Sequence, residues 1–167
     1  MLLSLFDAAL LVATLSCALV AGLVFGFAVV VMPGIATLSD RDFLLAFKRM
    51  DAVIQNRQPF FMVVWVGSIF WVLLTLVLGT LQLRGLECAM LWFGGGLYLF
   101  AVQGPTIRFN IPLNNRVQAL EIHSLSDSEI TEARTQFEVS WNRWNRFRTV
   151  TAIVSVLALL ILQWLLR

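Results

Sequence analysis

Four long apolar stretches, separated by polar segments, run along the chain. They cover residues 10–32, 60–81, 88–104 and 148–166. An α-helix crosses a bilayer with roughly 17–25 mainly apolar residues, and each stretch has a length in that range. The pattern predicts an all-α polytopic membrane protein whose single domain, residues 1–167, is a bundle of four transmembrane helices.

The polar segment of residues 33–59 is expected to leave the membrane, because Pro33-Gly34 should end the first span. Within it, apolar residues recur at helical spacing among charged ones: Phe43, Phe47, Met50 and Ile54. This spacing predicts a short amphipathic helix over residues 39–56, capped by Ser39 or Asp40. We expect the helix to lie along the membrane interface or to fold against the bundle.

The second polar segment, residues 105–146, begins with a region that should not continue the third span. Pro112 forbids a straight helix through Asn110 and Asn114. A break near lipid is tolerated only where protein or a wet cavity surrounds the freed backbone groups. Because asparagine side chains bond such groups well, Asn110 and Asn114 are expected to serve them.

The rest of this segment predicts one long helix. Ser126 and Glu129 have the spacing of a capping box, and neither Pro nor Gly occurs from there to Arg167. A helix from Asp127 to about Leu166 would be roughly 60 Å long at ~1.5 Å per residue. Its first half should therefore project beyond the bilayer and its second half should form the fourth span.

Three consecutive glycines, Gly94-Gly95-Gly96, lie in the middle of the third span. Each glycine weakens a helix by about 1 kcal/mol relative to alanine. We expect them to allow close contact between helices, with a hinge or room for a ligand as the alternative.

Composition agrees with a membrane protein and excludes several other classes. The chain is 59% hydrophobic and 13% charged, whereas soluble domains carry about 25% charged residues. A net charge of +2 gives no indication of nucleic-acid binding. Cys17, Cys88 and the single histidine, His123, lack the spacing of metal ligands, so we expect no metal. Motifs of hydrolases, kinases and nucleotide-dependent dehydrogenases are absent.

The distribution of basic residues predicts the orientation of the bundle. Ten of the twelve Lys and Arg residues fall within residues 33–59 or 105–148, and only Arg84 and Arg167 fall on the opposite side. By the positive-inside rule, the two long polar segments are cytoplasmic and both termini are outside. We expect the protein to lie in the inner membrane of a bacterium.

The candidate site lies where the fourth helix passes from water into lipid. Trp141, Trp144, Asn145 and Arg148 are three or four residues apart and should share one face of the helix. Together with Asn110 and Asn114 they suggest a binding site for a small aromatic molecule. In it, the arginine would hold an anionic oxygen, the asparagines would orient polar groups, and the indoles would stack on a ring.

A structural explanation is also open for these six residues. Tryptophan and arginine are common anchors at membrane interfaces. The asparagines and Arg148 would then only close the broken end of the third helix by bonding its backbone.

Three motifs resemble those of the anthrone oxygenase-like membrane family: Met32-Pro33-Gly34-Ile35, Asn110-x-Pro112-Leu113-Asn114 and Trp144-Asn145-x-x-Arg148-Thr149. The resemblance covers nearly the whole chain in order and spacing. It implies a four-helix membrane fold and, from some fungal relatives, oxidation of anthrones to anthraquinones without metal or flavin. Such chemistry requires a base, and His123 lies outside the matched motifs, so no catalytic residue is assigned.

Two functions follow as hypotheses. The first is a cofactor-independent anthrone-type oxygenase with a small-molecule site at the cytoplasmic end of the bundle. The second is a non-enzymatic interaction module that binds lipid or a larger membrane complex through the projecting helix, whose residues 131–140 suit a solvated arm. The expected partners are the lipid bilayer, an aromatic small molecule, and a second copy of the chain or a membrane complex.

Overall fold

The computed structural model describes residues 4–167, which form helices and no strand. In chain order the elements are α1 (Leu5–Gly26), η1 (Phe27–Val31), α2 (Met32–Ile35), α3 (Asp40–Gln55), α4 (Pro59–Gln82), α5 (Gly85–Leu97), η2 (Tyr98–Gln103), η3 (Thr106–Asn110), α6 (Ile111–Ala119) and α7 (Asp127–Leu165). The η segments are π-helical turns inside longer helices. Four continuous runs are long and apolar enough to span a membrane: Leu5–Ile35, Pro59–Gln82, Gly85–Ala119 and Asp127–Leu165. The predicted all-α polytopic bundle is confirmed.

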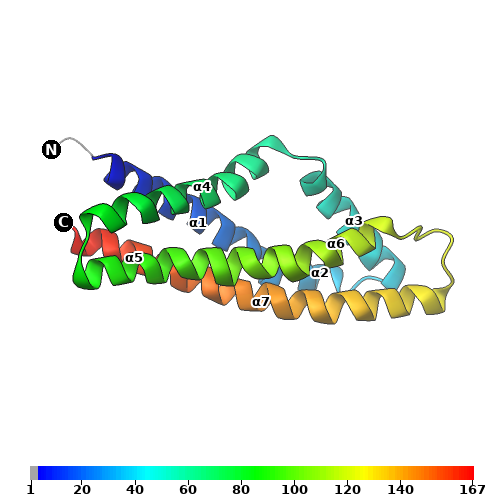
Figure 1. The fold of residues 1–167 in the computed structure, drawn as a ribbon. Helices are drawn as coiled ribbons and strands as arrows, with labels where there is room; N and C mark the ends of the chain where they lie inside the picture. Colours follow the sequence, from blue (N-terminus) through cyan, green and yellow to red (C-terminus); the bar gives the residue numbers. More distant parts are fainter. Residues whose placement is uncertain (1–3) are drawn as a thin grey trace.

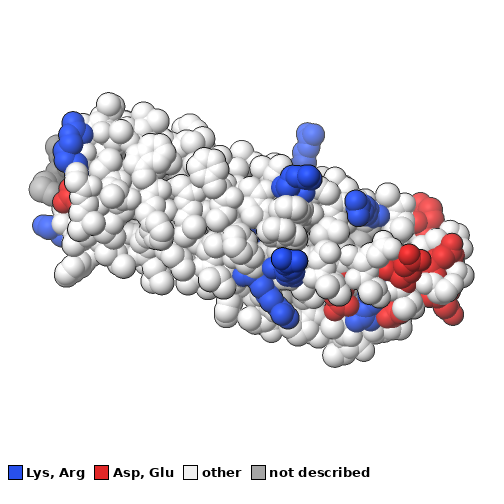
Figure 2. Space-filling view, turned by 60° about the horizontal axis from the view of Figure 1, so that its bottom comes forward, with Lys and Arg blue, Asp and Glu red and all other residues white. Residues whose placement is uncertain are grey.

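The two ends of the bundle differ in composition. Both termini and the turn between α4 and α5 lie at one end, whereas α3, α6 and the start of α7 lie at the other (Figure 1). Figure 2 shows an uncharged body, a belt of basic side chains beside it, and acidic side chains gathered at the far tip. An uncharged exterior of this size is typical of an integral membrane protein, in which lipid surrounds the body.

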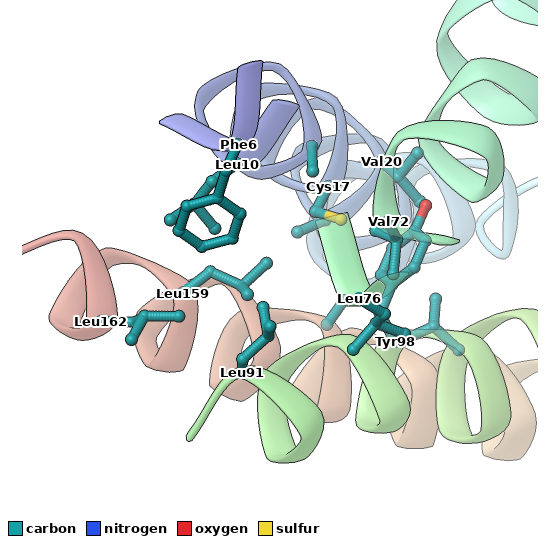
Figure 3. Close-up of a cluster of buried hydrophobic side chains, with 14 of the residues drawn as sticks. Phe6, Leu10, Cys17, Val20, Val72, Leu76, Leu91, Tyr98, Leu159 and Leu162 are labelled. Carbon is teal, nitrogen blue, oxygen red and sulfur yellow. The ribbon is translucent and has the colours of Figure 1, made fainter. Parts of the chain in front are cut away.

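The core of the uncharged body lies where α1 packs against α4 and α7, with α5 closing the bundle beside α7 (Figure 3). Tyr98 is fully buried there, and its hydroxyl lies 2.6 Å from that of Ser68 and 2.9 Å from the Gln103 amide. The Ser155 hydroxyl donates to the Gly94 carbonyl at 2.8 Å. This bond brings α5 and α7 into close contact, as the small residues of α5 predict.

The expected end of the first span at Pro33-Gly34 is wrong. The helix continues to Ile35, and Pro33 lies in the first turn of α2, where its missing N–H is not needed. The π-turn η1 comes just before it, and the Met32 N–H bonds the Phe27 carbonyl, five residues earlier. This wider turn lets the helix pass the proline.

The expected break at Pro112 is also wrong, for the same reason. The third helix continues from Gly85 to Ala119. In η3 the Ile111 N–H bonds the Thr106 carbonyl, five residues earlier, and Pro112 then lies in the first turn of α6. A π-turn adds a residue to a helix and rotates the following side chains, and such turns are frequent at functional sites.

The amphipathic helix is confirmed as α3, and Ser39 is its N-cap residue. The long helix α7 is confirmed with its capping box of Ser126 and Glu129. The first half of α7 is not a solvated arm, however. Its buried Phe137 packs on the α3 side chains Phe43 and Phe47, with ring centroids 6.3 and 4.5 Å away.

Arg134 of α7 attaches this layer of helices to the end of the first helix. Its guanidinium pairs with Asp40 at 2.9 Å and with Glu138 at 2.8 Å, and it donates to the carbonyl of Ala36. Its Cζ also lies 4.4 Å from the centre of the Phe43 ring. The layer formed by α3, α6 and the first half of α7 is called the cap below.

We predict opposite effects on stability for two neighbouring glycines. A methyl group added at Gly94 would lie 3.0 Å from Leu159 and 3.3 Å from the Cβ of Ala158, whereas one at Gly96 meets nothing within 4 Å. Gly94→Ala should lower the stability by about 1–3 kcal/mol through overpacking. Gly96→Ala should raise it by up to about 1 kcal/mol, the helix propensity of alanine. Thermal unfolding in detergent measures both, and equal effects would contradict the close α5–α7 contact.

We also predict that acid loosens the cap. Hydrogen bonds from the Thr131 hydroxyl and from Arg134 lower the pKa of Asp40 below its ordinary value of 3.8. A carboxyl group with a lowered pKa in the folded state stabilises it above the ordinary pKa, and this contribution disappears as the pH falls through the lowered value. Asp40→Asn should therefore reduce the unfolding temperature at neutral pH and have little effect in strong acid. A difference that persists in acid would contradict the role of this carboxylate.

Candidate active site

A cavity of about 350 Å³ lies between the membrane-spanning helices and the cap. Small-molecule sites have volumes of about 300–1,000 Å³ and mostly apolar walls. The walls here are apolar and aromatic, with side chains from α1, α3, α4, the third helix and α7. The polar residues that line it are Asp51, Gln103, Thr106, Asn110, Asn114 and Arg148.

Arg148 carries the only charge that α7 contributes to the wall, and it is 6% exposed. Its Nε and Nη2 donate to Oδ1 of Asn145 at 3.1 and 2.9 Å, and its Nη1 donates to the Thr106 hydroxyl at 3.1 Å. Among residues 4–167, the ion pairs do not include Arg148. Burying a charge without a counter-ion costs several kcal/mol, so this positive charge favours an anion in the cavity.

Trp141 lies beneath the guanidinium and links it to α6. The Cζ of Arg148 is 5.5 Å from the centre of the Trp141 ring, a cation–π distance. Trp141 Nε1 donates to Oδ1 of Asn114 at 2.8 Å, and the ring packs edge-on against Phe47 at 5.5 Å. Trp141 therefore packs against the guanidinium of Arg148 and helps to fix its position.

Asp51 of α3 is a site residue that the sequence pattern did not single out. It is 3% exposed and lines the cavity. Its Oδ1 accepts from Asn114 at 2.7 Å, and its Oδ2 accepts from Gln55 and Gln118, both at 2.8 Å. The relevant signal was its spacing, since Asp51 lies four residues after Phe47 and three before Ile54, on the apolar face.

Asn110 offers the cavity a free acceptor. The side chain is 1% exposed, and its Nδ2 donates to the Trp141 carbonyl over a long 3.4 Å. Within residues 4–167, Oδ1 of Asn110 is the one buried side-chain oxygen or nitrogen atom that has no hydrogen-bond partner. Since a buried acceptor without a donor is costly, a ligand hydroxyl would satisfy Asn110.

The structure brings four of the six candidate residues together at the cavity. Asn110, Asn114, Trp141 and Arg148 line the cavity together. Asn145 lies behind Arg148, fully buried, and its Nδ2 donates to the Val24 carbonyl of α1 at 3.0 Å. Trp144 lies outside the cavity, stacked on Phe109 of the third helix with ring centroids 3.8 Å apart.

Comparison with known families identifies the family of the chain. A family model described as anthrone oxygenase matches residues 56–158, well over half of the chain. The chain belongs to the anthrone oxygenase family. The match includes all six candidate residues and ends before the last turns of α7, whereas Asp51 precedes it. Comparison with curated proteins and with solved structures gave no match.

We predict that Asn110 and Asn145 differ in their effect on stability. Asn145→Leu removes a donor to Val24 and the acceptor of two Arg148 bonds, so it should cost at least about 1–3 kcal/mol. Asn110→Leu removes one long bond and one unpaired oxygen, so stability should stay nearly unchanged. Thermal unfolding in detergent compares the two. A large loss for Asn110→Leu would favour the structural explanation of this residue over ligand binding.

Proposed function

We propose that this protein oxidises an anthrone-like phenolic carbon acid with dioxygen in the cavity beneath the cap. The observation that carries the proposal is the buried Arg148, which lines the cavity without a carboxylate partner among residues 4–167. Membership of the anthrone oxygenase family supports this class of reaction. The specific substrate is part of the proposal.

Arg148 would stabilise the charge that develops when the substrate loses a proton. Loss of a proton from the methylene carbon of an anthrone leaves an anion whose charge rests largely on the carbonyl oxygen. An arginine has five N–H donors, and Arg148 uses three of them within the protein. The remaining two are available to this oxygen, in an apolar setting where hydrogen bonds to an anion are strong.

The walls of the cavity suit a flat, apolar substrate. Five aromatic side chains line the cavity together with the polar residues: Phe27, Phe47, Phe61, Trp65 and Trp141. Four apolar lining residues are also exposed on the surface of the spanning helices: Leu23 by 37%, Val66 by 51%, Ile107 by 62% and Ile111 by 43%. Since lipid covers that surface, a ring system dissolved in the bilayer would approach the cavity from the side.

The reaction balances with dioxygen as the only co-reactant. The substrate anion reduces dioxygen and forms a carbon–oxygen bond at the former methylene carbon, and protonation gives a hydroperoxide. Loss of the second hydrogen from this carbon as a proton cleaves the O–O bond and forms the second carbonyl group. The products are one anthraquinone and one water for each anthrone and each dioxygen.

The proposed orientation follows the belt of basic residues. Ten of the twelve Lys and Arg residues belong to the half of the molecule that contains the cap and the point at which α7 enters the uncharged body. By the positive-inside rule we assign this half, and with it the cavity, to the cytoplasmic side of a bacterial inner membrane.

We predict that the purified protein consumes oxygen when given an anthrone, and that Arg148→Ala reduces kcat/KM by about 10²–10³-fold, as for loss of an oxyanion donor. Arg148→Lys should recover only part of the loss, because lysine cannot keep both the bonds to Asn145 and a donor to the substrate. Arg146→Ala, an exposed arginine of the same helix, is the matched control and should behave like the parent. Failure of the parent protein to consume oxygen would refute the proposal.

A further inference from the structure

The cavity contains a carboxylate on the side that belongs to the cap. Asp51 projects from α3, whereas Arg148 projects from α7, and both line the same apolar space. The two are joined through protein groups, since Asp51 accepts from Asn114, Asn114 accepts from Trp141, and the Trp141 ring lies under the guanidinium. An anion-binding group and a proton acceptor are thus present in one cavity.

The carboxylate of Asp51 keeps capacity for a further hydrogen. An ionised carboxylate accepts about four hydrogen bonds, and Asp51 receives three, of which only one goes to Oδ1. All three donors are neutral carboxamides. The nearest lysine along the helix, Lys48, donates to the Leu120 carbonyl instead, and the ion pairs among residues 4–167 do not include Asp51.

We propose that Asp51 is the general base that removes the proton from the methylene carbon of the substrate. This assignment rests on the proposed function and adds the group that the sequence did not supply. The C–H bond breaks, its proton goes to the free position on Oδ1 of Asp51, and its electron pair enters the ring system toward the oxygen held by Arg148. The carboxylic acid then returns a proton to the peroxide anion that forms with dioxygen, which restores the carboxylate.

The surrounding amides support this role in a specific way. Carboxamides hold a carboxylate in one orientation without neutralising it, as a cationic partner would. Asn114 and Gln118 both come from α6, so they fix α3 to α6 and Asp51 to the wall of the cavity at once. Gln55, one turn further along α3, completes the set. A purely structural role for Asp51 in joining α3 to α6 is the alternative that an experiment must separate.

The experiment compares the parent with Asp51→Asn, Asp51→Glu and Arg148→Gln in detergent, by oxygen uptake with an anthrone and by quenching of tryptophan fluorescence with the product anthraquinone. We expect Asp51→Asn to lower kcat by about 10²–10⁴-fold, the usual contribution of a general base. Anthraquinone binding should change less than about 3-fold, because the Asn oxygen can still accept from the surrounding amides and Arg148 is unchanged. Asp51→Glu should retain more activity than Asp51→Asn.

Raising the pH supplies the readout that a structural role would not change. At a pH high enough for the free anthrone to ionise in solution, no base is needed. The rate of oxygen uptake by Asp51→Asn should then approach that of the parent. Arg148→Gln should not recover, because it lacks the anion-binding group. If Asp51→Asn retained oxygen uptake at neutral pH, the assignment of Asp51 as the base would be overturned, whereas the proposed function would stand. A loss that persists at high pH together with lost anthraquinone binding would assign Asp51 a structural role, and absence of uptake by the parent would overturn the proposed function and this assignment together.

Discussion

The arrangement of the helices around the cavity depends on the hydrogen bonds of the buried Arg148 guanidinium. Its hydrogen bond to Thr106 connects α7 with the third helix, while Asn145 and Trp141 of α7 itself hold it in position. Asn145 continues the connection to α1 through Val24. All of these partners are neutral, so they orient the charge and leave it uncompensated. Since the desolvation of a charge costs several kcal/mol, a site that keeps it unpaired is better explained by a ligand than by stability.

The number and location of the helices were predictable because lipid imposes a simple rule on the sequence. A span must be long, apolar and internally hydrogen-bonded, and this requirement is visible in composition alone. The continuity of the first and third helices was not predictable. Pro33 and Pro112 are ordinary helix breakers, and the π-turns that allow the chain to pass them leave no mark in the pattern of apolar residues. The same turns determine that Thr106 and Asn110 face the cavity.

The site was predictable in part, for a geometric reason. Spacing along one helix brought Trp141, Asn145 and Arg148 to one face, because the helix between them is regular. That Trp144 instead stacks on Phe109 depends on how the third helix packs, which spacing within α7 does not contain. Asp51 was overlooked because a charged residue in an amphipathic helix is ordinarily assigned to water. Its burial requires the amides of α6, which come from a distant part of the sequence.

The two charged groups of the cavity belong to different layers of the protein, and this separation bears on its chemistry. Arg148 is set by helices that lipid holds in place, whereas Asp51 is set by the cap, whose attachment depends on Arg134 and its partners Asp40 and Glu138. A carboxylate and a guanidinium in direct contact would neutralise each other and leave neither for a substrate. Here Asn114 and Trp141 lie between them, and each group keeps unused bonding capacity. The cap thus contributes a carboxylate, and the spanning helices contribute a guanidinium, to one cavity.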